Sequence, residues 1–153
     1  MEAEKIKHFY DNDGYIVERK FLNQNEISEL IDETERFNKD IVPSLPRDVV
    51  FYENKNDQST LKQIQHLDQY CNYFKKLAAS PKVVELAELL LEGKAILKNM
   101  QYFDKVPIIG KETPPHQDGF YFKIKPQIAL TMWLSLGDAD GDNGAVTYIP
   151  GSH

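Results

Sequence analysis

Apolar residues at helical spacing predict two long helices in this chain. The apolar stripe of the first consists of Ile27, Leu30, Ile31 and Phe37. Asn23, with Glu26 three residues later, is the pattern of a capping box, so this helix is predicted over 24–38. Ser80 and Pro81 are typical of a helix start and predict the second helix over 81–91. A shorter helix is expected near 4–10.

After Gly93 the apolar period changes from helical to strand-like. The pattern predicts strands over 95–103, 116–124, 128–136 and 145–149, and a sheet that holds 95–103, 116–122 and 129–136. Short strands are also expected at 15–17 and 49–52. Helices followed by strands indicate an α+β fold with an antiparallel β-core, in a single domain over 1–153.

The segment 130–136 has two different faces at strand period. Leu130, Met132, Leu134 and Leu136 form the apolar face. The other face carries Thr131, Trp133 and Ser135. An aromatic side chain between two hydroxyls suits the wall of a ligand pocket. The alternative is an ordinary sheet with a tryptophan that faces solvent.

Composition narrows the classes of partner. The 153 residues carry a formal net charge of -6, and no run of Lys and Arg opposes it. We therefore expect no nucleic-acid partner and no membrane partner, and a small molecule as substrate. The single cysteine, Cys71, and a charged N-terminus without an apolar stretch favour the cytoplasm. The sequence carries no signal for oligomeric state.

The main chemical signal is His116-Gln117-Asp118. Residues two apart on a strand project to the same face, so His116 and Asp118 can point at one ion. An imidazole and a carboxylate are two of the three ligands in the facial triad of non-haem Fe(II) oxygenases. The same pair also occurs as ordinary hydrogen-bonded surface residues, so this motif alone leaves both interpretations open.

The sequence motifs occur in the same order as in a known enzyme family. The order of the motifs is that of the phytanoyl-CoA dioxygenase-like family: first Phe9-Tyr10-Asp11-Asn12-Asp13-Gly14-Tyr15-Ile16-Val17, then His116-Gln117-Asp118-Gly119, Met132-Trp133-Leu134, Asn143-Gly144 and Ile149-Pro150-Gly151-Ser152-His153. The chain resembles that family over nearly its whole length, and 116–153 is the most specific part.

The resemblance implies a double-stranded β-helix, a jelly-roll or cupin-like core with outer helices, and an enzyme that uses Fe(II), 2-oxoglutarate and O₂. Such an enzyme would hydroxylate a small organic molecule and decarboxylate 2-oxoglutarate to succinate. His116 and Asp118 match the first two iron ligands. Positions that bind 2-oxoglutarate in the family are matched by Lys62, Met100, Gln117 and Trp133.

The family's third iron ligand, a His, and its 2-oxoglutarate-binding Arg follow well beyond the Pro-Gly-Ser-His segment. Neither position falls within these 153 residues, and His153 matches the segment's own His. The domain is therefore expected to be incomplete here, and the 153 residues alone are expected to be inactive. The alternative to an enzyme is a non-catalytic or fragmentary cupin-like binding domain.

Overall fold

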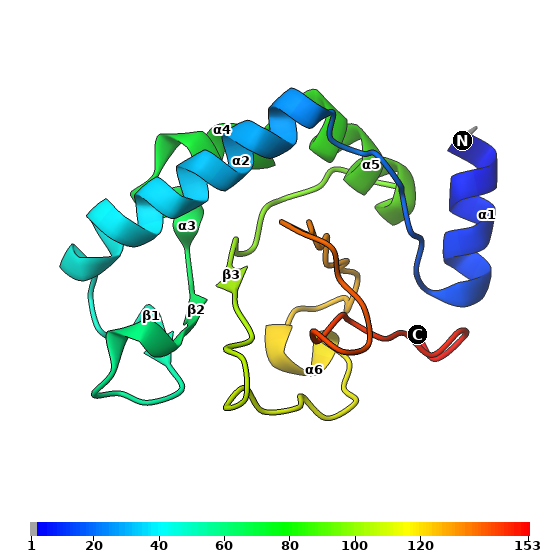
Figure 1. Ribbon diagram of the computed structural model, residues 1–153. Coiled ribbons are helices and arrows are strands. Elements are labelled where there is room, and N and C mark those ends of the chain that lie inside the picture. The colour runs from blue at the N-terminus through cyan, green and yellow to red at the C-terminus, as the bar shows by residue number, and fades with distance from the viewer. Residues whose placement is uncertain (1–2) are drawn as a thin grey trace.

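The computed structural model describes residues 3–153 and confirms the two predicted long helices and the shorter one before them (Figure 1). They are α1 (Ala3–Asp13), α2 (Gln24–Arg36) and α5 (Pro81–Leu91). The capping box of α2 is formed: the Asn23 side chain accepts hydrogen bonds from the Asn25 and Glu26 amides, and Glu26 accepts one from the Asn23 amide. These local bonds satisfy backbone groups that the first helical turn leaves free.

Short helical segments fill much of the remaining first half. They are the π-helix η1 (Phe37–Ile41), the 3₁₀-helices η2 (Val42–Ser44) and η3 (Gln58–Thr60), and the α-helices α3 (Leu67–Tyr70) and α4 (Asn72–Ala78). The pattern of apolar residues did not predict α3 and α4. Each spans few turns, so neither contains enough residues to establish a period.

The sheet is small and antiparallel, with the order β1-β2-β3. It consists of β1 (Val50–Tyr52), β2 (Leu61–Ile64) and β3 (Tyr102–Phe103). Val50 pairs with Ile64, which in turn pairs with Tyr102. This mixture of helices and one antiparallel sheet is compatible with the predicted α+β class. The described residues do not form a double-stranded β-helix.

The core lies between the sheet and the helices α2 and α4. Its buried members are Leu22, Leu30, Phe37, Val42, Val49, Val50, Ile64, Leu67, Cys71 and Phe74. The rings of Phe37 and Phe74 meet edge to face, with centroids 5.4 Å apart. No residue from 91 to 153 is buried, so the second half of the chain covers this core without extending it.

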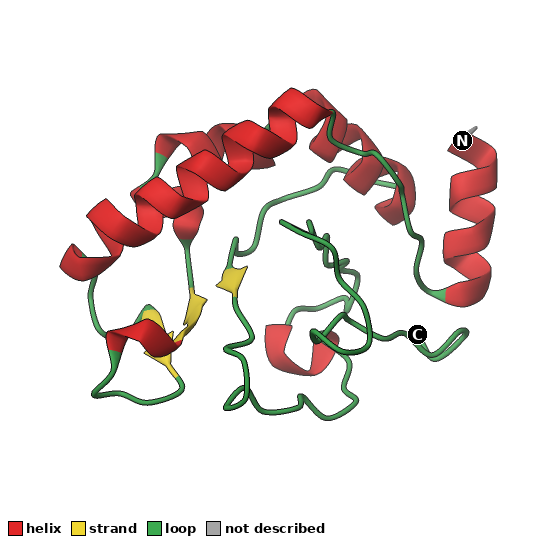
Figure 2. Cartoon of the chain, in the orientation of Figure 1, coloured by secondary structure: helices red, strands yellow, loops and turns green. Residues whose placement is uncertain are grey.

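Several predicted strands are wrong in this structure (Figure 2). Residues 15–17, 128–136 and 145–149 form no ladder, and only Tyr102–Phe103 of the segment 95–103 is a strand. Residues 119–122 of the predicted strand 116–124 form the short helix α6 (Gly119–Phe122). The physical reason is pairing: a strand needs a neighbour for its amides, whereas local turn bonds such as Tyr121 N to Asp118 O need none.

The end of the chain returns to the first helix, as the red trace near α1 shows in Figure 1. The Gly151 amide donates to the Asp13 carbonyl at 2.9 Å, and His153 Nε2 lies 3.1 Å from the Asp11 carbonyl oxygen. The rings of Tyr15 and Tyr148 stack with centroids 5.0 Å apart. The first and last motifs of the resemblance therefore lie side by side.

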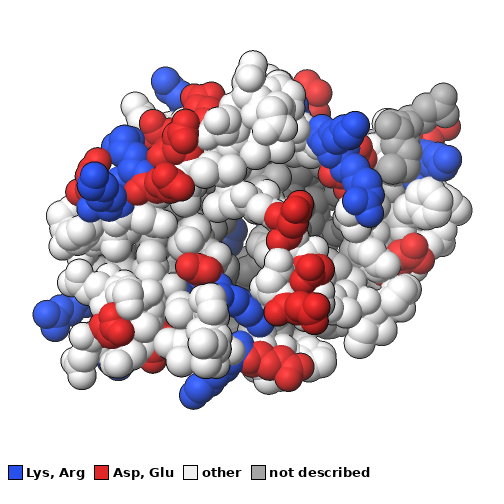
Figure 3. Space-filling model, in the orientation of Figure 1, with Lys and Arg blue, Asp and Glu red and all other residues white. Residues whose placement is uncertain are grey.

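The surface carries charges of both signs. On the face shown in Figure 3, Lys and Arg are interspersed with Asp and Glu. Within residues 3–153, no helix has the length and apolar character needed to cross a membrane.

Candidate metal site

His116 and Asp118 meet in the loop that leads into α6. His116 Nε2 lies 3.3 Å from Asp118 Oδ1, and both side chains are partly exposed. Two atoms that bind one metal ion at neighbouring positions, each about 2.1 Å from it, are about 3 Å apart. The separation therefore suits a shared ion, and the structure brings together the two residues that the sequence proposed as ligands.

The hydrogen bond on the far side of the imidazole sets its tautomer. His116 Nδ1 lies 2.8 Å from the Pro114 carbonyl oxygen, which can only accept, so Nδ1 carries the proton. In the neutral ring Nε2 is then an acceptor that faces the carboxylate of Asp118, which is also an acceptor. Two acceptors at this distance require a proton or a cation between them. A His whose other ring nitrogen donates to a carbonyl is the usual arrangement of a metal ligand, so this donor set fits Fe(II).

Three further side chains lie around the pair, and of these only Thr131 was on the face that the sequence predicted for a pocket. Thr131 Oγ1 donates to Asp118 Oδ2. The Tyr121 ring of α6 lies edge-on to the His116 ring, with centroids 5.6 Å apart. Burial raises the pKa of Tyr148, and the nearby Asp118 carboxylate raises it further. Alternation along 130–136 placed Thr131 on the predicted pocket face, but nothing in the sequence indicates Tyr121 or Tyr148.

Gln117 points to a different partner from its two neighbours. Its amide nitrogen donates to the Ser152 carbonyl at 2.6 Å. It thus ties the metal-site loop to the Pro-Gly-Ser-His segment, while His116 and Asp118 face each other. Asp118 has helical backbone angles (φ -58°, ψ -30°), so this arrangement arises at the turn into α6 and not from an extended strand.

Lys62 and Met100 lie on or beside the sheet. Lys62 is on β2, and its ammonium forms an ion pair with Glu53 at 3.1 Å. Met100 is partly buried against the core, and its carbonyl accepts a hydrogen bond from the Leu67 amide at 3.0 Å. Their proposed contact with 2-oxoglutarate remains a prediction.

Trp133 lies on the more exposed side of its segment. Along 130–136 the side chains alternate between partly buried and exposed, with Leu134 and Leu136 packed against the core. Thr131 and Trp133 share the exposed side, and Thr131 bonds to Asp118. Trp133 as a whole residue is 46% exposed. The two faces predicted for this segment are thus present without a regular strand, and the place of Trp133 in a pocket wall remains a prediction.

A third ligand does not join the pair within residues 3–153, where no group of three His, Cys, Asp or Glu side chains could hold a metal ion. His153 instead packs at the end of α1, beside the Asp11 carbonyl. The arrangement supplies two ligands from one short loop.

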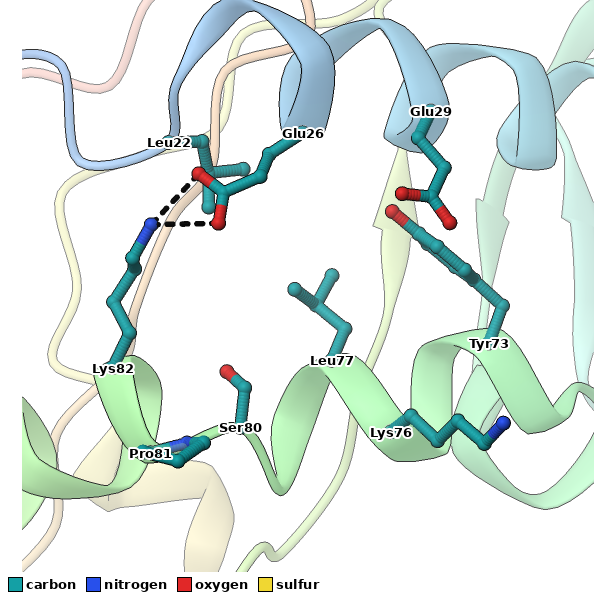
Figure 4. Close-up of a pocket in the computed structure, with 9 residues that line it drawn as sticks. All are labelled: Leu22, Glu26, Glu29, Tyr73, Lys76, Leu77, Ser80, Pro81 and Lys82. Carbon is teal, nitrogen blue, oxygen red and sulfur yellow. Dashed lines mark hydrogen bonds and ion pairs between the residues drawn. The ribbon is translucent and has the colours of Figure 1, made fainter.

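A separate groove of about 480 Å³ lies between α2 and the α4–α5 pair (Figure 4). Glu26 and Lys82 close one end through an ion pair of 2.7 and 2.8 Å. Leu22 and Leu77 line its apolar part, and Tyr73 and Glu29 lie at the other end in Figure 4. None of the predicted site residues lines this groove, so it is separate from the candidate metal site.

Comparison with known proteins agrees with the motifs. The family model described as phytanoyl-CoA dioxygenase matches residues 10–153. A zebrafish protein named phytanoyl-CoA dioxygenase domain-containing protein 1 is 38% identical over 63% of this chain and 34% of its own length. Rice phytanoyl-CoA dioxygenase 1 is 34% identical over 67% of this chain and 41% of its own length.

A bovine relative, named as the peroxisomal phytanoyl-CoA dioxygenase, is 24% identical over 96% of this chain and 46% of its own length. The chain thus spans between about a third and a half of these relatives. With a family model that matches nearly every residue and the motifs of that family in order, this chain belongs to the phytanoyl-CoA dioxygenase family.

Proposed function

We propose that the chain is part of an Fe(II)- and 2-oxoglutarate-dependent dioxygenase that hydroxylates a small organic molecule, within a single oxygenase domain of the jelly-roll type. The observation that carries the proposal is the pairing of His116 Nε2 with Asp118 at 3.3 Å, with Nδ1 held by a carbonyl. Family membership supports a dioxygenase-type activity, and the local donor set favours iron among the cofactors that such chemistry uses.

Each residue has a definite task in this proposal. His116 offers a neutral nitrogen lone pair and Asp118 a negative charge, the two donor types of the facial triad. When bound, Fe(II) would supply the site at which O₂ is activated as 2-oxoglutarate is decarboxylated to succinate. Gln117, Trp133 and Met100 would line the co-substrate's position, as their counterparts do in the family.

Lys62 would meet a carboxylate of 2-oxoglutarate. In this structure its ammonium is neutralised by Glu53. An ammonium has three donor hydrogens, so Lys62 can keep Glu53 and add a second carboxylate, or exchange one for the other. Glu53 would then tune how strongly the co-substrate is held.

The test is conversion of 2-oxoglutarate to succinate by the full-length protein with added Fe(II). We expect succinate from the wild type and its loss in His116→Ala and Asp118→Ala. His8→Ala is the matched control, because His8 lies on α1 and its ring bonds to Asn12. Metal-independent turnover, or full activity in both ligand variants, would refute the proposal. A wild type that forms no succinate would favour the non-catalytic binding domain.

A further inference from the structure

The two oxygen atoms of the Asp118 carboxylate contact different partners. Its Oδ1 faces His116 Nε2 at 3.3 Å, and its Oδ2 accepts a hydrogen bond from Thr131 Oγ1. Thr131 lies thirteen positions further along the chain, in a different segment from the metal-site loop. The orientation of the carboxylate is therefore set from outside the loop that carries it.

The segment that presents Thr131 is anchored. Leu134 and Leu136 from the opposite side of 130–136 pack against the core. Thr131 is β-branched, which restricts rotation about its χ1 angle. A hydroxyl held in this way fixes the direction of its hydrogen bond more closely than a donor on a long, flexible side chain would. Asp118 lacks such support on its own side, because the residues before it form an irregular loop.

An Asp carboxylate can bind a metal through one oxygen or through both. A hydrogen bond to Oδ2 occupies one oxygen and leaves Oδ1 directed toward the lone pair of His116. Partners of this kind, which bond to a ligand rather than to the metal, typically change metal affinity 10- to 100-fold when they are removed.

We propose that Thr131 is a positioning residue for the metal site, whose hydroxyl orients Asp118 so that only Oδ1 faces the ion. The inference rests on the proposed function, since it needs a metal at His116 and Asp118. It gives the Thr131 hydroxyl a role that neither the His116-Gln117-Asp118 motif nor the contact between His116 and Asp118 requires.

The experiment is anaerobic titration of the full-length protein with Co(II), a spectroscopic substitute for Fe(II), followed by visible absorption. Thr131→Val keeps the shape and removes the donor, so we expect Co(II) affinity to fall about 10- to 100-fold and the absorption bands to shift as coordination changes. Thr131→Ser keeps the hydroxyl and should restore affinity and bands. Ser135→Ala is the control: Ser135 lies on the same side of the segment and bonds to the Gly137 carbonyl.

Equal affinity and identical bands in Thr131→Val and the wild type would overturn the proposal while leaving the metal site intact. Equal losses in Thr131→Val and Thr131→Ser would also overturn it, since they would indicate disturbed packing. Co(II) binding by Asp118→Ala that is as tight as binding by the wild type would refute the proposed function itself. These outcomes separate the two ideas.

Discussion

Gly14 occupies a position that other residues fill poorly. Its φ of +80° lies in the left-handed region, directly after α1, and its amide donates to the Tyr10 carbonyl at 2.8 Å. A Cβ at this position would overlap Nδ1 of His153 and lie 2.7 Å from its Cβ. The turn that ends α1 therefore depends on glycine both for its backbone and for the approach of His153.

We predict that Gly14→Ala lowers the free energy of unfolding by about 1–2 kcal/mol, from the left-handed backbone alone. Displacement of His153 adds to this cost. Urea denaturation measures the difference. Gly137→Ala is the matched control, because a Cβ there meets open space. Equal stabilities of the two variants would contradict this account of Gly14.

For individual residues, the sequence predicts contacts between near neighbours in the chain and misses contacts that depend on the fold. His116 and Asp118 lie 3.3 Å apart at the turn into α6, where Asp118 has helical backbone angles, so their proximity does not come from the predicted strand alternation. Alternation along 130–136 does indicate the side on which Thr131 lies. The approach of Tyr148 to Asp118, thirty positions apart, depends on how loops cross, and no local pattern encodes that.

Among the elements, α2 and α5 are joined by one ion pair with a predictable response to pH. Lys82 and the Asn23 amide both donate to the Glu26 carboxylate and hold its pKa below the ordinary value of 4.5. A carboxyl with a lowered pKa in the folded state stabilises the fold at pH values above its unfolded pKa. That contribution is lost as pH falls through the folded pKa.

We predict that Glu26→Gln reduces thermal stability at neutral pH and that the difference from wild type shrinks below the folded pKa of Glu26. Thermal unfolding at a series of pH values measures this. Glu29→Gln is the matched control, because Glu29 lines the same groove and also loses a charge. A stability difference that stays constant with pH would show that the ion pair is not its cause.

The helices were predictable because their signals are local. Asn23 and Glu26 mark the start of α2, and a repeated apolar stripe defines its length. The segment 116–124 shows the opposite case, because its aromatic residues favour a strand. In the structure, the carbonyls of Gln117 and Asp118 accept hydrogen bonds from amides of α6 instead. Strand patterns become strands only where a partner lies beside them.

Within residues 3–153, the buried apolar side chains all lie in the first ninety residues. The buried cluster joins α2, α4 and the sheet, whereas large apolar side chains such as Ile96, Ile108 and Phe120 in the second half are largely exposed. This uneven distribution predicts that the same kind of substitution has very different effects in the two halves.

Phe37→Ala should lower the free energy of unfolding by about 3–5 kcal/mol, because it empties a fully buried site that contacts Phe74. Phe120→Ala, at a side chain that is 76% exposed, should change it by less than about 0.5 kcal/mol. Chemical denaturation of both variants tests this. Similar losses in both would mean that the second half shares the core.

In the proposed function, His116 and Asp118 hold Fe(II) together with 2-oxoglutarate. The direct measurement is anaerobic addition of Fe(II) and 2-oxoglutarate to the full-length protein, with detection of the visible charge-transfer absorption of an Fe(II)–2-oxoglutarate chelate. We predict this absorption in the wild type and its absence in the double variant His116→Ala/Asp118→Ala. The same absorption at the same concentrations in the double variant would contradict the claim.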